Sequence, residues 1–169
     1  GIRDFCLSRG LGDVYKRHIL IGGGIGTPPL LSVAQTLPGQ TEAILGFRNA
    51  DACILARDFA LACANVQIAT DDGSLGFHGL VTDLLRERIA VKEKPCTGIL
   101  ACGPTPMLKA IAALAQEHQI PCQVSLEERM GCGVGACLVC ACKTKEADGE
   151  HYRHVCKDGP VFDAREVVW

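Results

Sequence analysis

Four cysteines near the C-terminus have a spacing that could hold an iron–sulfur cluster. Cys132, Cys137 and Cys140 lie close together, and Cys156 follows Cys140 after fifteen intervening residues. This C-x4-C-x2-C…C arrangement is the ligand spacing of plant-type [2Fe–2S] proteins. Such a cluster moves single electrons, so the spacing predicts a [2Fe–2S] site with these four thiolates as its ligands.

The residues between the ligands favour iron–sulfur over zinc. Gly133 and Gly135 allow the positive φ angles with which a loop points its backbone N–H groups at sulfur. No acidic residue lies between Cys132 and Cys142 that would add to the charge of the thiolates. A structural zinc site is the alternative, although zinc sites more often pair two C-x2-4-C knuckles. Cys142 lies outside the spacing and is interpreted as a bystander, but a ligand set that includes it stays open.

Short apolar runs alternate with helical segments before these cysteines. Runs bounded by Gly, Pro or Asp predict strands at 18–21, 43–47, 66–70, 97–101 and 122–126. Helices are expected at 27–37, 51–62, 80–89 and 107–118. Strands of this length between helices predict the α/β class, a doubly wound parallel sheet with helices on both faces. We expect this domain to span 18–127, followed at 128–169 by a small cluster-binding module of loops and short strands.

Several residues with ligand-binding chemistry follow the predicted strands. Ligands of doubly wound sheets bind beyond the carboxyl ends of the strands, and a glycine-rich turn there brings a pyrophosphate to a helix N-terminus. The candidates at these ends are Gly22, Gly23, Gly24, Gly26, Thr27, Phe47, Arg48, Asp71, Asp72, Cys102, Gly103 and Pro104. The alternatives are a tight βα turn for the glycines, a surface ion pair for Arg48 and a capped turn for Asp71 and Asp72.

The amino-acid composition excludes several classes of protein. The 169 residues include 17 basic and 19 acidic side chains, so the chain has no excess of positive charge that would indicate binding to nucleic acid or to an anionic membrane surface. No apolar run approaches the roughly 18 residues that a membrane span requires. The eleven cysteines are an odd number without a disulfide pattern. Reduced thiols of this kind predict a cytoplasmic location.

The first seventeen residues stand apart. Gly12 to Arg17 (GDVYKR) resembles read-through of a sequencing adaptor, and a natural linker is the alternative. We therefore expect 1–17 to be a non-native or linker segment and leave it out of the fold prediction.

Four motifs along the chain resemble the nicotinamide half of the ferredoxin–NADP reductase superfamily. They are GGGIGTPPL at 22–30, GFR at 46–48, TDDGSLG at 70–76 and CGPTPM at 102–107. The tail is more specific: SLEERMGCGVGAC at 125–137 and VCKDGPVFD at 155–163 resemble the electron-transfer subunits of dihydroorotate dehydrogenase type B. The resemblance covers residues 18–169.

The resemblance implies a set of cofactors and a partner. NAD would lie between the glycine loop and Gly103-Pro104, with Cys102 near the nicotinamide and Met107 in the same motif. Electrons would pass from the FMN of a separate dihydroorotate-oxidising subunit, in a heterotetramer, through the [2Fe–2S] cluster and FAD to NAD⁺. The flavin-binding barrel motif of the family is absent here, so the resemblance implies that FAD binds the full-length protein rather than this chain alone. No residue of this chain is predicted to be catalytic in its own right, and the chain alone is expected not to oxidise NADH.

Two other functions remain open. One is a flavin and iron–sulfur subunit of another NAD(P)H oxidoreductase, such as a ferredoxin:NADP reductase, sulfite reductase or hydrogenase. The other is a zinc-stabilised binding module without catalytic function.

Overall fold

The structure is a computed structural model that describes residues 17–91 and 95–169. The segment 1–17, predicted to be non-native or a linker, lies outside the described residues except for Arg17. Arg17 is the first residue of a strand, and its guanidinium donates a hydrogen bond of 3.1 Å to the Glu42 carboxylate.

The strands and helices follow the predicted alternation as far as Ser125. The strands are β1 (Arg17–Gly23), β2 (Thr41–Phe47), β3 (Asn65–Thr70), β4 (Phe77–His78), β5 (Cys96–Cys102), β6 (Cys122–Ser125), β7 (Ala141–Glu146), β8 (Gly149–His154) and β9 (Val161–Asp163). The helices are α1 (Thr27–Thr36), α2 (Ala56–Ala62), α3 (Val81–Ile89), α4 (Thr105–Glu117) and α5 (Val155–Asp158), with 3₁₀ turns η1 (Gly24–Gly26) and η2 (Ala50–Ala52).

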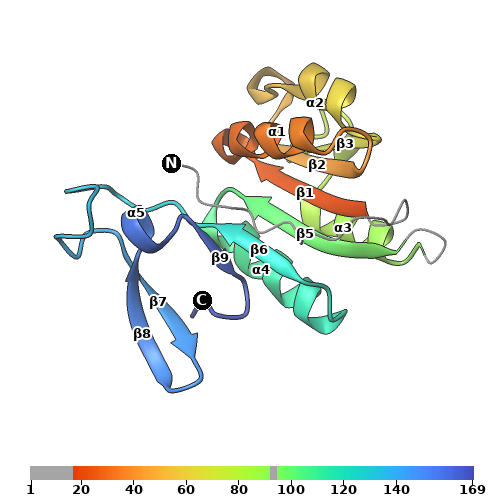
Figure 1. The fold of residues 1–169 in the computed structure, drawn as a ribbon. Helices are drawn as coiled ribbons and strands as arrows, with labels where there is room; N and C mark the ends of the chain where they lie inside the picture. The colour runs from red at the N-terminus through yellow and green to blue at the C-terminus, as the bar shows by residue number, and fades with distance from the viewer. Residues whose placement is uncertain (1–16, 92–94) are drawn as a thin grey trace.

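The main sheet has seven strands in the order β4-β3-β2-β1-β5-β6-β9 (Figure 1). Strands β1 to β6 pair in parallel. The chain moves outward from β1 to β2 and β3 and then crosses back to β5 on the other side of β1. The predicted α/β class is thus confirmed, and the point where the strand order reverses lies between β1 and β5. Ligand sites of such sheets lie beside that point.

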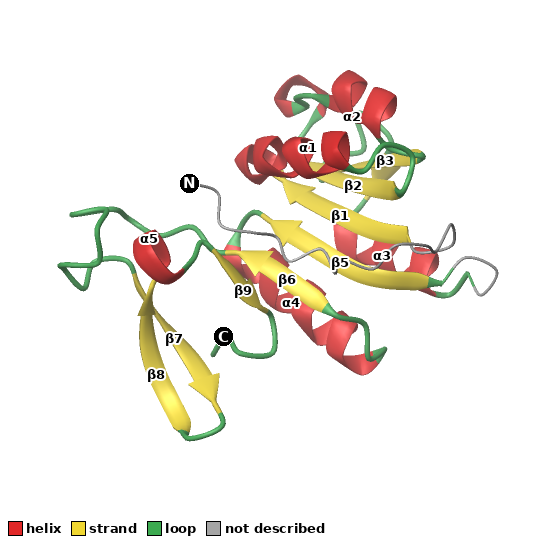
Figure 2. Ribbon diagram, in the orientation of Figure 1, coloured by secondary structure: helices red, strands yellow, loops and turns green. Residues whose placement is uncertain are grey.

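Alternating side chains of the central strands build two hydrophobic layers. In β1, Leu20 packs with the α1 and α2 side, whereas Ile19 and Ile21 pack with the α3 and α4 side. In β5, Leu100 packs on the α1 and α2 side, and Ile99 packs on the α3 and α4 side. Figure 2 shows the two helix pairs on opposite faces of the sheet. Because both faces are covered, the middle residues of the central strands are apolar and buried.

The helix predicted at 51–62 is divided in two. Asn49 accepts a hydrogen bond from the Ala52 N–H and caps the short turn η2. The backbone is extended at Cys53 and left-handed at Leu55 (φ 58°), so α2 begins only at Ala56. The break brings Ile54 to the ligand side of the sheet.

The C-terminal part extends from the sheet and then returns to it. A loop after β6, the antiparallel hairpin β7–β8 and the short helix α5 project to one side in Figure 1. The last strand, β9, then pairs antiparallel with β6, with Ser125 opposite Val161 and Val124 opposite Phe162. Strand β9 therefore belongs to the main sheet, although it follows the predicted cluster ligands in sequence.

Among the described residues, no helix combines the length and the apolar character needed to cross a lipid bilayer.

Candidate functional site

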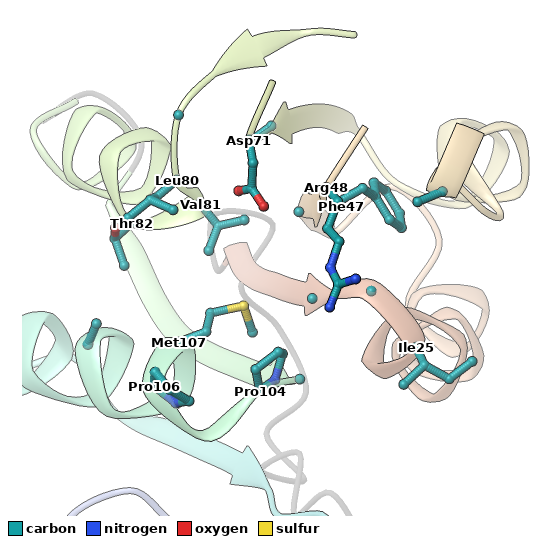
Figure 3. A pocket seen from close by; sticks show the side chains of 18 of the residues that line it. Ile25, Phe47, Arg48, Asp71, Leu80, Val81, Thr82, Pro104, Pro106 and Met107 are labelled. Atoms are coloured by element: carbon teal, nitrogen blue, oxygen red, sulfur yellow. The ribbon is translucent and has the colours of Figure 1, made fainter. Parts of the chain in front are cut away.

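A cavity of about 840 Å³ opens at the carboxyl ends of the parallel strands, and we call it the switch-point cavity. Its walls come from the loops after β1, β2, β3 and β5 and from the starts of α3 and α4 (Figure 3). Eight predicted cofactor residues line it: Gly23, Gly24, Phe47, Arg48, Asp71, Gly103, Pro104 and Met107. Its size is that of a small-molecule or cofactor site.

The remaining five predicted cofactor residues, Gly22, Gly26, Thr27, Asp72 and Cys102, do not line the cavity. Gly26 supports its base: a Cβ there would lie 2.6 Å from the Gly103 nitrogen. Glycine thus allows the β1–α1 loop to touch the β5–α4 loop, backbone against backbone. This contact fixes the positions of the two loops that carry the lining residues Gly23, Gly24 and Gly103.

Thr27 lies beneath the glycine loop, in the first turn of α1. Its side chain is fully buried, and its hydroxyl has no hydrogen-bond partner in the structure. Buried hydroxyls without a partner are uncommon in proteins. The N–H groups at the start of α1, next to this hydroxyl, favour anions, so this end of the helix fits a site for phosphate oxygens.

Charged side chains enter the cavity from two neighbouring strand ends. Figure 3 shows Arg48, after β2, and Asp71, after β3, both pointing into the cavity, with Met107 and Pro104 on the α4 side. The cavity therefore offers a cation and a carboxylate above an apolar floor.

Asp72 instead holds two loops together. Its carboxylate accepts hydrogen bonds from the Ser74 N–H (2.9 Å) and hydroxyl (2.6 Å), and these lower the pKa of Asp72. The Ser74 hydroxyl accepts a 2.8 Å bond from the Ala50 N–H. Asp72 thus fixes the loop after β3 against the loop after β2.

Cys102 is buried behind Gly103. Burial raises the pKa of this thiol, as does the charge of Glu127, while a hydrogen bond with Ser125 opposes the rise. The thiol is therefore protonated and shielded.

Sequence reasoning missed several lining residues. The further ones are Ile25, Gly46, Ala52, Ile54, Ala69, Gly79, Leu80, Val81, Thr82, Pro106, Ala110 and Glu127. Ile25 and Leu80 are large apolar side chains that are 74% and 60% exposed. Glu127 is notable because it joins the cavity to the loop that carries the cysteines. An acid directly after a predicted strand was the available signal for it.

The loop between β6 and β7 wraps backbone donors around the first predicted ligand. We call residues 130–140 the cluster loop. The Cys132 sulfur accepts hydrogen bonds from the N–H groups of Val134 (3.5 Å), Ala136 (3.2 Å) and Cys137 (3.4 Å). These bonds, that from Val134 foremost, lower the pKa of Cys132 to about 6. The loop thus stabilises a thiolate, which is the form that binds iron.

The four predicted ligands associate as two pairs. The Cys137 thiol hydrogen-bonds to Cys132, and a hydrogen bond with Cys140 raises the pKa of Cys156. The charges of Cys140 and Cys132 also act on Cys156, so the pairs adjoin. Within 17–91 and 95–169, no three Cys, His, Asp or Glu side chains are placed to hold a single metal ion. Two adjoining thiol pairs suit a two-iron cluster better than one zinc ion.

Cys142 lies apart from these pairs. It is buried and donates a hydrogen bond of 3.4 Å to the Arg153 carbonyl, and burial raises its pKa. These contacts favour the interpretation of Cys142 as a bystander.

Comparison with known proteins places both halves of the chain. Residues 127–168 match the family model of the iron–sulfur cluster binding domain of dihydroorotate dehydrogenase B. The chain is 43% identical over 155 residues to a protein of Caldanaerobacter subterraneus subsp. tengcongensis, and 44% identical over 156 residues to one of Bacillus caldolyticus. Both are named dihydroorotate dehydrogenase B (NAD(+)), electron transfer subunit. The resemblance expected from the motifs is confirmed.

The matches cover most of this chain but only part of the relatives. They include 91% and 90% of this chain, which spans 60% and 58% of the two relatives. A solved NADH-dependent reduced ferredoxin-NADP oxidoreductase, described for flavin-based electron bifurcation, superposes with a TM-score of 0.78 at 31% identity. That match covers 92% of this chain and 55% of the other. The C-terminal domain of a Pyrococcus furiosus hydrogenase, at 16% identity and a TM-score of 0.52 over 66% of this chain and 92% of that domain, shares the fold.

Proposed function

We propose that this chain is the nicotinamide- and cluster-binding part of an electron-transfer subunit of an NAD-dependent dihydroorotate dehydrogenase, which serves pyrimidine biosynthesis. The observation that carries the proposal is the combination on one chain of the switch-point cavity and the paired cysteines, joined through β6 and Glu127. The sequence identity of 43% to a protein of that name, over 91% of this chain, supports it.

The switch-point cavity is the proposed NAD site. The backbone of Gly23 and Gly24 and the N-terminus of α1 would receive the pyrophosphate, with the unpaired Thr27 hydroxyl beneath. Arg48 and Asp71 would contact phosphate or ribose. Gly103, Pro104 and Met107 would flank the nicotinamide. When bound, NAD supplies hydride chemistry, and the chain's part is to orient the ring and exclude water.

The cluster loop is the proposed [2Fe–2S] site. Its residues fit the cofactor, because Cys132 is already stabilised as a thiolate and the four thiols form two adjoining pairs. The cluster would supply one-electron transfer. The protein's contribution is a set of N–H donors and the positive φ of Gly133 and Gly135, 70° and 78°, which direct them.

FAD is proposed to connect hydride and one-electron chemistry in the full-length subunit. Ile25 and Leu80 leave large apolar side chains exposed where they line the cavity. We expect a flavin-binding domain, in the part of the relatives that this chain does not span, to cover them.

The proposed partner is an FMN-containing subunit that oxidises dihydroorotate, in a cytoplasmic heterotetramer. The cluster loop exposes four large apolar side chains, Met130, Val134, Leu138 and Val139, of which Val134 and Leu138 are more than 70% exposed. Exposed apolar residues gathered on one loop mark an interaction surface. A partner that buries them would bring its own redox centre to the cluster.

A subunit of another NAD(P)H oxidoreductase is the second candidate, favoured by the TM-score of 0.78 to the ferredoxin-NADP oxidoreductase. A zinc-stabilised binding module is a third candidate, which the paired arrangement of the thiols disfavours.

Co-purification tests the proposal. The chain, extended by a flavin domain of the family, is co-expressed with a dihydroorotate-oxidising subunit and purified without oxygen. We expect a complex that contains iron, sulfide, FMN and FAD and reduces NAD⁺ with dihydroorotate. The 169-residue chain alone should show a cluster spectrum but no NADH oxidation with artificial electron acceptors. Stoichiometric zinc without sulfide, or a complex that is inert to dihydroorotate but reduces another acceptor, would exclude this function.

A further inference from the structure

The segment that carries Cys156 also holds a cation against the cluster loop. Lys157 follows Cys156 in α5, and its aliphatic stem packs over Gly135, between Cys132 and Cys137. A Cβ on Gly135 would lie 2.7 Å from the Lys157 Cδ and 3.1 Å from its Cβ. Only glycine leaves room for this contact, so the lysine stem is held beside the ligands.

The charge of Lys157 is not neutralised by the protein. Residues 130–142 contain no Asp, Glu, Lys, Arg or His. The adjacent Asp158 carboxylate is engaged by His154: it accepts a 2.8 Å hydrogen bond from the His154 N–H and lies 3.8 Å from its Nδ1. Lys157 is exposed and forms no ion pair with any residue in the described ranges. Its positive charge is therefore not cancelled by a carboxylate of the described residues, and its stem lies against the loop that carries the ligands.

We propose that Lys157 raises the reduction potential of the [2Fe–2S] cluster. This inference rests on the proposed function, because it requires that the cluster is bound. One-electron reduction adds one negative charge to a centre that already carries four thiolates, and a nearby ammonium stabilises that added charge. Net charge around the cluster is one of the properties that set such potentials. Lys157 is thus a tuning residue and not a ligand.

Four variants separate the charge from the packing. Lys157→Met keeps the stem and removes the charge, Lys157→Gln does the same with a polar end, and Lys157→Arg keeps the charge. Lys145→Met is the matched control, because Lys145 is an exposed lysine near the far end of the β7–β8 hairpin, in register with Glu150. Each 169-residue chain is loaded anaerobically with iron and sulfide, and its midpoint potential is measured by redox titration followed by electron paramagnetic resonance, at low ionic strength to limit screening.

We expect wild-type iron and sulfide content in all four variants and a lower midpoint potential in Lys157→Met and Lys157→Gln alone. An unchanged potential in Lys157→Met overturns the inference, as does an equal fall in Lys157→Arg or Lys145→Met. Loss of the cluster from both neutral variants also overturns it, because Lys157 would then hold the loop in place. If the wild-type chain itself binds no cluster, the proposed function fails, and that outcome is distinct from the others.

Discussion

Replacing Gly26 by Ala tests whether the close contact between two loops shapes the switch-point cavity. Gly26 has φ −73° and ψ −6°, which any residue adopts, so alanine adds no backbone strain. Its Cβ would lie 2.5 Å from the Cys102 carbonyl carbon and 2.6 Å from the Gly103 nitrogen, where 3.4–4 Å is ordinary contact. The loops after β1 and β5 must therefore separate by about 1 Å.

The expected loss of stability follows from the backbone groups that must move to make room for the new Cβ. Added groups in a packed site cost about 1–3 kcal/mol, and we expect about 2–3 kcal/mol because the clash is with backbone. For a protein of this size, 1 kcal/mol changes Tm by about 2–4 °C, so Tm should fall by about 4–12 °C. The shift also displaces the lining residues Gly23 and Gly103. Losing about 1.4 kcal/mol of binding free energy through these displaced contacts would lower the NADH affinity about tenfold, which is the change we expect.

Thermal unfolding and a fluorescence titration with NADH measure the two effects. Gly39→Ala is the control: Gly39 lies between α1 and β2 with nothing within 4 Å of its Cβ position and a φ of 72°. Alanine there meets only the left-handed backbone cost of about 1–2 kcal/mol and should not change NADH affinity. Wild-type Tm and NADH affinity in Gly26→Ala, or an equal loss of NADH affinity in Gly39→Ala, would refute the reasoning.

Three further predictions concern the cluster, a buried ion pair and the choice of nucleotide. Serine at Cys132, Cys137, Cys140 or Cys156 should abolish a cluster that otherwise contains about two irons and two sulfides, whereas Cys142→Ser should retain it; iron and sulfide analysis decides. Glu42 is buried and paired with Arg88 and Arg17; burial acts to raise its pKa, but these bonds outweigh burial and lower it from 4.5. Its stabilising contribution is therefore complete above the unfolded-state pKa and is lost as the pH falls through the lower folded-state pKa. Glu42→Gln should lower the free energy of unfolding at pH 7 by about 3–5 kcal/mol, and urea titrations should show this difference shrinking in acid; an equal difference at all pH values would contradict it. NADH should bind more tightly than NADPH, because Asp71 would repel a 2′-phosphate and Arg48 is the single cation among the described residues that line the cavity; tighter binding of NADPH in parallel titrations would reverse this expectation.

The strands of the main sheet could be predicted from the sequence because local residue patterns determine where they begin and end. Apolar runs that end at glycine, as at Gly22 and Gly103, predicted where strands stop and ligand loops begin. The helix at 51–62 was wrong in its first turn, because the Asn49 cap and the left-handed Leu55 divide it. These features depend on backbone angles that no periodic pattern records.

Contacts between segments far apart in the sequence were harder to predict. Leu80, Val81 and Thr82 reach the cavity because α3 starts beside β2 and β3, which depends on the packing of the α3–α4 layer. Cys102 lies behind the cavity wall, since alternation in β5 turns its side chain into the core on the α1 side. The end of a strand predicts which residues lie near a ligand. The direction in which each side chain points depends on the pairing register of the strands, which the sequence pattern does not give.

Strand β9 determines how the proposed cluster-binding segment is attached to the main sheet. Ser125 and Val161 are paired neighbours, and the Leu126 N–H donates a 2.9 Å hydrogen bond to the Pro160 carbonyl. Residues 126–160 thus leave and re-enter the fold through one ladder, whose strands lie about 5 Å apart. The cluster loop thus belongs to a segment whose two ends are held by neighbouring strands, β6 and β9. The tail after β9 also bonds to the β7–β8 hairpin, through the Lys145 N–H to the Glu166 carbonyl (2.6 Å) and the Val168 N–H to the Lys143 carbonyl (3.0 Å). Moving the segment away from the sheet would therefore require breaking backbone hydrogen bonds at the β6–β9 edge or along the tail.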